Sequence, residues 1–201
     1  MTLSQSKDSK ERLMAAAIEL MASRGYKGVS TKEIASAAGV SEMTLFRQFG
    51  SKKNLLDQAV DRYHYAAEME RFFQDAIVWE LRADLTRISR LYHDIMHRNR
   101  HLFLIVLKDD ELTDIRERAQ QHPRKLLALL TGYLADMRER QAVTDMDVQA
   151  QAIAFMWMNY GAFMAGLFGA SPIADRSMES ILAGGVDSFV RAWSAVPEQS
   201  I

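Results

Sequence analysis

Residues 30–56 read STKEIASAAGVSEMTLFRQFGSKKNLL, and this stretch decides the fold. Ser30 precedes Glu33 by three positions, which is the spacing of a capping box, so a short helix is predicted to begin at Thr31. Gly39 stands where such a helix must stop on a residue that accepts a positive φ. The first half of the stretch therefore predicts a helix followed by a tight turn.

The second half predicts another short helix. Ser41 is placed to cap a helix over about 42–49, in which Leu45 and Phe49 lie four positions apart and share one apolar face. Gly50 ends this helix, and the chain then starts a further helix at once. Two short helices joined by a glycine turn form a helix-turn-helix pattern.

The polar face of the second helix suits a DNA duplex. A helix fits the major groove, where Arg47 can donate two bonds to guanine and Gln48 can pair with adenine. The helix starts at 30–31 and 51–52 offer backbone N–H groups to phosphates. The alternative is that these residues are ordinary caps and solvated faces of a helical bundle, because glycine turns between helices are common.

The preceding residues add to the pattern, since 9–24 read as an amphipathic helix that leads into GYKGVS. The combined run AAAIELMASRGYKGVSTKEIASAAGVSEMTLFRQFGSKKNLL resembles the DNA-binding domain of the TetR (tetracycline repressor) family of bacterial regulators. This resemblance implies an all-α fold of about nine helices. It divides the chain into a three-helix DNA-binding domain over 1–56 and a helical effector-binding and dimerisation domain over 57–201.

The likeness also implies the residues that meet DNA. Phe46 stands where the family usually has tyrosine, and Met43 where a small residue is common, so the hydroxyl contact of that tyrosine is absent. Lys52 falls on the family's phosphate-binding lysine at the next helix start. The complete set of expected DNA-binding residues is Ser30, Thr31, Lys32, Ser41, Met43, Thr44, Phe46, Arg47, Gln48 and Lys52.

Charge and composition agree with a cytoplasmic bacterial regulator. The net charge of the 201 residues is only −1, but residues 1–56 carry +4 and residues 57–201 carry −5. A basic end on an acidic body is an electrostatic footprint for nucleic acid. The absence of cysteine excludes disulfides, thiolate catalysis and cysteine-bound zinc, and residues 1–12 contain no apolar signal-peptide core.

The remaining chain is predicted to be helical, because no glycine or proline occurs between Ser51 and His122. A long helix from Lys52 into the 70s would belong to both domains and transmit movement between them. Thr144 and Asp147 have capping-box spacing. The other expected helices cover about 81–98, the apolar run 102–107, Pro123 to Gln141, 145–169 and 175–194.

Residues 148–174 contain no charged side chain. Their apolar part approaches the length of a membrane span, and Gly161, Ala165 and Gly169 repeat at four-residue spacing. The polar Gln149, Gln151 and Asn159 and the lack of a flanking basic cluster argue against a span. A buried helix with a dimer surface is favoured, and the resemblance implies that 145–169 and 175–194 pair across a two-fold axis into a four-helix bundle.

Methionine and aromatic side chains are predicted to line a pocket for a flat or hydrophobic effector. For each of them, packing in the hydrophobic core without any ligand is an equal alternative. The expected pocket residues are Met96, Phe103, Leu107, Leu130, Met137, Met156, Trp157, Tyr160, Phe163 and Met164.

An enzyme is not expected, because the sequence has no phosphate loop and no nucleophile motif. His93, His97 and His101 repeat every four residues, but a helix break is expected at 99–100 and no acidic partner completes a metal site. No metal or cofactor is predicted. Three hypotheses follow: a homodimeric DNA-binding regulator, which is favoured; a ligand-binding bundle without DNA reading; and a membrane-tethered interaction protein.

Overall fold

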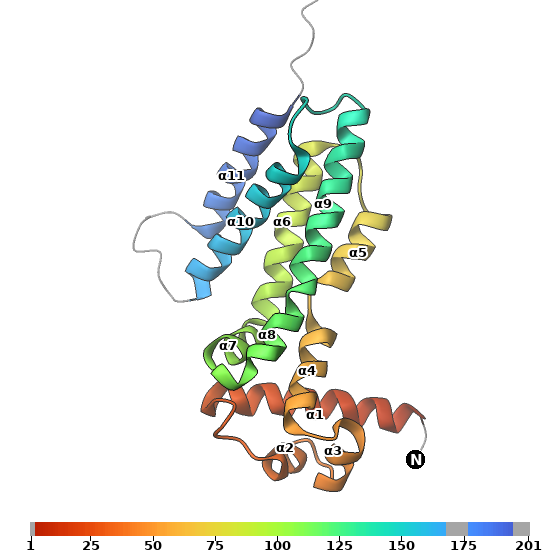
Figure 1. Cartoon of the computed structure of the whole chain (residues 1–201), viewed down its shortest axis with the longest axis vertical. Coiled ribbons are helices and arrows are strands. Elements are labelled where there is room, and N and C mark those ends of the chain that lie inside the picture. The colour runs from red at the N-terminus through yellow and green to blue at the C-terminus, as the bar shows by residue number, and fades with distance from the viewer. Residues whose placement is uncertain (1–2, 168–176, 195–201) are drawn as a thin grey trace, which may run out of the picture. The chain divides into compact units, whose positions relative to one another are not determined.

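The computed structural model describes residues 3–167 and 177–194, and their secondary structure is helical throughout (Figure 1). The predicted all-α class is confirmed. Within these described residues no β-strand forms, and an isolated antiparallel bridge joins Val143 to Ser194. The chain divides into two compact units, Met1–His64 with Asn99–Gln120 and Tyr65–Arg98 with Gln121–Ile201.

The first unit is built around its N-terminal helix, α1, which contacts α2, α4 and α7, while α2 packs on α3 and α4 on α8. Leu13, Ile34, Leu45 and Leu55 come from four of these helices and are fully buried in one core. The helices are α1 (Leu3–Arg24), α2 (Thr31–Ala37), α3 (Glu42–Phe49), α4 (Lys52–Tyr63), α7 (Arg100–Lys108), the 3-10 helix η1 (Asp110–Leu112) and α8 (Thr113–Ala119).

The predicted turn chemistry of this unit is confirmed. Ser30 and Glu33 form both arms of a capping box, with Glu33 N–H donating to Ser30 Oγ (3.2 Å) and Ser30 N–H to Glu33 Oε2 (2.9 Å). Ser41 caps α3, and Gly39 and Gly50 adopt φ of +65° and +73° at the two helix ends. Local hydrogen bonding therefore fixes the helix-turn-helix.

In the second unit, α10 lies against α6, α9 and α11, and α5 packs on α6 and α9. Phe155 and Phe163 of α10 are its largest fully buried side chains. Gly185 of α11 lies against the side chain of Met158 on α10, because a Cβ at this position would meet Met158 Sδ. The helices are α5 (Ala66–Asp75), α6 (Leu81–Arg98), α9 (Gln121–Glu139), α10 (Val148–Leu167) and α11 (Met178–Trp193).

The prediction of one long helix from Lys52 into the 70s is wrong. The chain leaves the helix at His64, which is extended (φ −74°, ψ 152°), and a new helix follows from Ala66. No glycine or proline signals this break. Tertiary contacts hold it, since the Asn99 side chain donates to the carbonyl of Tyr63 (2.6 Å) at the end of α4.

The compact units also differ from the division at residue 56. The first unit contains all of α4, and residues 99–120 pack on α1 and α4 although they follow α6 in sequence. Buried Leu102, Ile105, Leu112 and Ile115 join the same core as α1. The functional boundary between 1–56 and 57–201 stays a prediction.

Other expected elements agree with the structure. The helices over 81–98, through 102–107 and from Pro123 are found, as is the break at Asn99. The expected Thr144–Asp147 capping box is wrong, because Asp147 itself accepts the N–H groups of Gln149 and Ala150. The parts of the predicted 145–169 and 175–194 helices at 168–169 and 175–176, including Gly169, lie outside the described residues.

The apolar α10 was the candidate membrane span. Within residues 3–167 and 177–194, no helix combines the length and the apolar character that a span requires.

Candidate nucleic-acid interface

Helix α3 presents one face to the core and another to solvent. Leu45 and Phe49 are buried, while Met43 is 77% and Phe46 47% exposed and Arg47 is exposed beside them. Met43 and Phe46 lie three positions apart on the helix, and exposed apolar side chains that are grouped in this way often mark an interaction surface. The exposed face of α3 therefore fits a helix that is presented to a ligand as large as a duplex.

Hydroxyl groups hold the two helices of the turn. Thr31 Oγ1 donates to Glu42 Oε1 (2.5 Å), which ties the start of α2 to the start of α3. Ser41 Oγ accepts the N–H of Thr44 (3.2 Å) and lies 2.9 Å from its hydroxyl. Lys32 is exposed on the first turn of α2. Thr31, Ser41 and Thr44 thus have structural partners in addition to their predicted role at DNA.

Gln48 has a partner that the sequence did not indicate. Its Nε2 donates to Ser9 Oγ on α1 (2.6 Å), while its Oε1 is buried without a hydrogen-bond partner. Both amide atoms would have to turn toward DNA for the predicted contact with adenine. That contact stays a prediction, and it requires Gln48 to exchange Ser9 for a base.

Lys52 is likewise engaged within the unit. Its Nζ donates to the backbone carbonyls of Tyr26 and Val29 (both 2.8 Å) and lies 4.2 Å from the centre of the Tyr26 ring. Burial lowers the pKa of Lys52, against the effect of Glu111 and Asp109. An ammonium has three N–H donors, so one remains for the predicted phosphate.

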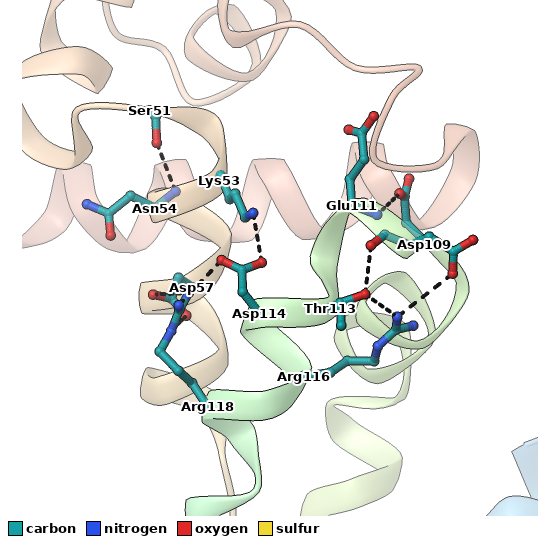
Figure 2. A network of polar contacts seen from close by, with 11 residues as sticks. Ser51, Lys53, Asn54, Asp57, Asp109, Glu111, Thr113, Asp114, Arg116 and Arg118 are labelled. Carbon is teal, nitrogen blue, oxygen red and sulfur yellow. Dashed lines mark hydrogen bonds and ion pairs between the residues drawn. The ribbon is translucent and has the colours of Figure 1, made fainter.

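Lys53, next in the chain, joins a set of ion pairs between α4 and α8 that the sequence analysis missed (Figure 2). Its Nζ lies 2.7 Å from Asp114 Oδ1, and Arg118 Nη2 lies 2.9 Å from Asp57 Oδ2. Arg118 also contacts Asp114 at 3.4 Å, which links the two pairs. We call these four residues the α4–α8 clasp.

The sequence provides little indication of the α4–α8 clasp. The run DDELTDIRER at 109–118 is densely charged, but a charge run is usually a solvated face and does not name its partners. The pairing depends on residues 99–120 folding back onto α1 and α4. In the same region Lys27 lies 3.1 Å from Glu111, so the acidic run also meets the loop before α2.

The predicted effector residues are divided between the two compact units. Phe103 and Leu107 belong to the first compact unit, and the other eight belong to the second. Met96, Leu130, Met137 and Phe163 are buried there, whereas Trp157 is 73% exposed. Tyr160 is also exposed, and Met156 and Met164 are half-buried. The exposed aromatics of α10 therefore point away from the interior of this chain.

The three histidines at four-residue spacing fall on two different helices. His93 and His97 lie on α6, and His101 lies on α7 in the other unit. Among the described residues, no three His, Cys, Asp or Glu side chains come together as metal ligands.

The exposed α3 on its capped turn has a counterpart in known proteins. Residues 13–59 match the model of the tetR family of bacterial regulatory proteins. The N-terminal helix-turn-helix domain of this chain is therefore of the TetR-family type. It is 26% identical over 188 residues to the HTH-type transcriptional regulator YvkB of Bacillus subtilis, a match that covers 93% of this chain and 98% of YvkB.

Solved structures of TetR-family regulators share the fold of most of the chain. NalD, the secondary repressor of the MexAB-OprM multidrug efflux pump in Pseudomonas aeruginosa, superimposes with a TM-score of 0.73 at 17% identity, covering 95% of this chain and 98% of NalD. The transcriptional regulator FadR of Bacillus subtilis, crystallised with stearoyl-CoA, gives 0.71 at 15% identity, covering 90% of this chain and 98% of FadR. These structures share the fold, and the family match over residues 13–59 together with the likeness to YvkB makes the chain a DNA-binding transcriptional regulator of the TetR type.

Proposed function

We propose that this TetR-family regulator is a homodimeric repressor that binds a two-fold symmetric operator in the bacterial cytoplasm and is released by a small hydrophobic effector. The observation that carries the proposal is the exposed face of α3, with Met43, Phe46 and Arg47 on a helix whose start is capped by Ser41. In such a complex the N-terminal half of α3 enters the major groove, and Arg47 reads guanine.

The exposed face of α10 supports the homodimer. Trp157 is 73% exposed, and Ala154, Gly161 and Ala165 continue the same face at helical spacing. Ile181 adds an exposed apolar side chain on α11. A second copy of the chain covers this face in an isologous two-fold interface, in which small residues let the helices approach closely. Two recognition helices then stand about 34–36 Å apart, one turn of the duplex.

The repressor role and the effector are supported by relatives and by the composition of the second unit. NalD is named a repressor, and FadR was crystallised with an acyl-CoA. Met96, Leu130 and Phe163 give the second unit of this chain an apolar interior of the kind that receives such ligands. The effector acts by binding better to a conformer in which the two α3 helices no longer match the operator spacing.

A gel-shift titration on the promoter region of the chain's own gene tests the proposal. Sequence-preferring binding at moderate salt, with two protomers per site, is the expected result, and binding that is indifferent to sequence would contradict it. Arg47→Ala should cost about 1–3 kcal/mol at the operator and relax the base preference. Arg138→Ala, which removes an exposed arginine of α9, is the matched control and should leave the operator affinity unchanged.

A further inference from the structure

Two neighbouring side chains make part of the exposed surface of α3 apolar. Among the described residues, Met43 is the most exposed of the large apolar side chains, at 77%. Phe46 follows three positions later and is also exposed, so the two side chains are neighbours on the surface of the helix. The core of the first unit uses Leu45 and Phe49 of α3 instead. The exposed pair is therefore available to a ligand.

Two hydrogen-bonding side chains of the same helix are engaged within the first unit. The Thr44 hydroxyl lies 2.9 Å from that of Ser41, and Gln48 Nε2 donates to Ser9 Oγ (2.6 Å). Gln48 Oε1 is buried, so the amide would have to leave α1 before it could reach a base. A base contact by Thr44 or Gln48 replaces an existing hydrogen bond, whereas an apolar side chain only sheds water when it meets the groove.

The major groove offers one apolar group to such side chains. The C5-methyl group of thymine projects into this groove, where the other base edges present hydrogen-bond donors and acceptors. Cytosine that is methylated at C5 carries the same group at the same place. Covering a methyl group with an apolar side chain is favourable, whereas covering a polar base edge without a hydrogen bond costs free energy.

The spacing of the two side chains matches neighbouring base pairs. Residues three apart on an α-helix are separated by about 4.5 Å along its axis, and base pairs stack at about 3.4 Å. A helix in the groove therefore brings Met43 and Phe46 to adjacent base pairs. Met43 lies in the first turn of α3, which is the end of a recognition helix that reaches base edges.

We propose that Met43 and Phe46 form a methyl-reading pair, which recognises the C5-methyl groups of pyrimidines on adjacent base pairs of the operator. This inference rests on the proposed binding of α3 in the major groove of an operator, and it names the chemical group that the helix reads there. Met43 and Phe46 are also the positions at which α3 departs from the residues usual in the TetR family. The preference is therefore expected to be particular to this chain.

Selection from a library of random duplexes, followed by uracil substitution, tests the methyl-reading pair. The purified full chain first selects its preferred sequence. Each thymine of a half-site is then replaced by deoxyuridine, which removes the methyl group and keeps the base pairing. We expect one or two positions in each half-site at which uracil lowers the affinity by about threefold to fivefold, the ratio that burial of one methyl group provides.

Cytosine and 5-methylcytosine, compared at these sensitive positions, distinguish the two sources of the methyl group. A gain in affinity from 5-methylcytosine over cytosine, of about the same factor, would extend the reading to methylated DNA. The absence of a gain would assign the reading to thymine alone.

Variants connect the methyl effect to the two side chains. Met43→Ala and Phe46→Ala should each lose most of the preference for thymine over uracil at one position, whereas Phe46→Tyr keeps the ring and should keep the preference. Val78→Ala, at an exposed apolar residue of the second unit, is the matched control and should keep it at every position. Because Met43 and Phe46 are exposed, their variants should unfold thermally at the wild-type midpoint, which separates reading from folding.

Two results would overturn the methyl-reading pair and leave sequence-specific DNA binding intact. One is a selected sequence in which uracil is tolerated at every position. The other is a thymine preference that survives when Met43→Ala and Phe46→Ala are combined. A selection that enriches no sequence would instead contradict the proposed operator and the methyl-reading pair together, so the two failures are distinguishable.

Discussion

Single residues of the helix-turn-helix stabilise the fold and are also predicted to contact DNA. Ser30, Thr31 and Ser41 accept or donate hydrogen bonds that set the helix starts, and they also lie at the ends of helices expected near phosphates. A short element has few positions, so its caps are also its exposed ends. Substitutions there must be tested for stability as well as for DNA binding.

Glu33 makes the stability of the first unit sensitive to acid. Hydrogen bonds from the side chain and backbone of Ser30, and then from Arg24, lower the pKa of Glu33 from 4.5 to about 2. Because the folded-state pKa is the lower one, the stabilisation is complete above pH 4.5 and is lost as the pH falls toward 2.

Urea unfolding from pH 6 to pH 2 measures this effect. Wild type should lose more free energy of unfolding over that range than Glu33→Gln, which keeps an oxygen acceptor but cannot titrate. Identical pH profiles for the two proteins would contradict the role of the carboxylate. The ion pair of Glu33 with Arg24 is exposed, so added salt should narrow the difference.

Replacing Lys52 is expected to lower the stability of the protein, apart from any effect on DNA binding. Lys52→Met leaves the carbonyls of Tyr26 and Val29 without their donor, so we expect it to lower the free energy of unfolding by about 1–3 kcal/mol. Lys32→Met, at an exposed position of α2, is the matched control and should change it by less than about 0.5 kcal/mol.

The same variant also tests the predicted phosphate contact. If the third N–H of Lys52 reaches DNA, Lys52→Met should weaken binding to all DNA sequences alike. It should also reduce the slope of the logarithm of the binding constant against the logarithm of the salt concentration by about one unit for each half-site. If the salt dependence of DNA binding is unaltered while the stability falls, Lys52 stabilises the fold and does not contact phosphate.

At the scale of elements, the position of α4 depends on more than its own sequence. Its first turn is fixed by the Ser51 cap, and its length by the Asn99 contact at Tyr63. The α4–α8 clasp joins its outer side to a segment that follows α6 in the chain (Figure 2). The helix that carries Lys52 is thus held by residues 99–120.

Charge reversal in the clasp should reveal this dependence. The groups are nearly half exposed, so Asp114→Ala should cost only about 0.2–1 kcal/mol of unfolding free energy. Asp114→Lys places like charges together and should lower the free energy of unfolding by more than Asp114→Ala does. Adding Lys53→Asp to Asp114→Lys should restore part of the lost free energy of unfolding. Lys125→Asp, at an exposed position of α9, serves as control. If the loss of unfolding free energy in the double variant equals the sum of the losses in the two single variants, Lys53 and Asp114 do not interact.

The whole molecule is expected to work only as a pair of chains. Trp157→Arg places a charge in the proposed interface on α10 and should shift the protein toward monomer in sedimentation experiments. Operator affinity should fall by about tenfold or more, because each half-site is then bound alone. Val78→Arg changes an exposed apolar residue in the loop between α5 and α6 and should leave the dimer intact. A Trp157→Arg protein that remains dimeric would show that this face of α10 is not the dimer interface.

By itself the sequence determined the local structure. The caps at Ser30 and Ser41, the helix start at 51–52 and the glycine turns at 39 and 50 were all predicted, because each depends on hydrogen bonds and backbone angles within a few residues. The family pattern follows from the same local signals. The exposed side of α3 was also predictable, since Leu45 and Phe49 mark its inner face.

Only the tertiary structure decided the partners of the functional residues. Gln48 bonds to Ser9, 39 positions away, and Arg118 bonds to Asp57 across 61 positions. No periodic pattern reports such pairs, because periodicity reflects which face of a helix is buried and not what covers it. The break of α4 at His64 depends on Asn99 in the same way, through a contact that exists only once the chain has folded.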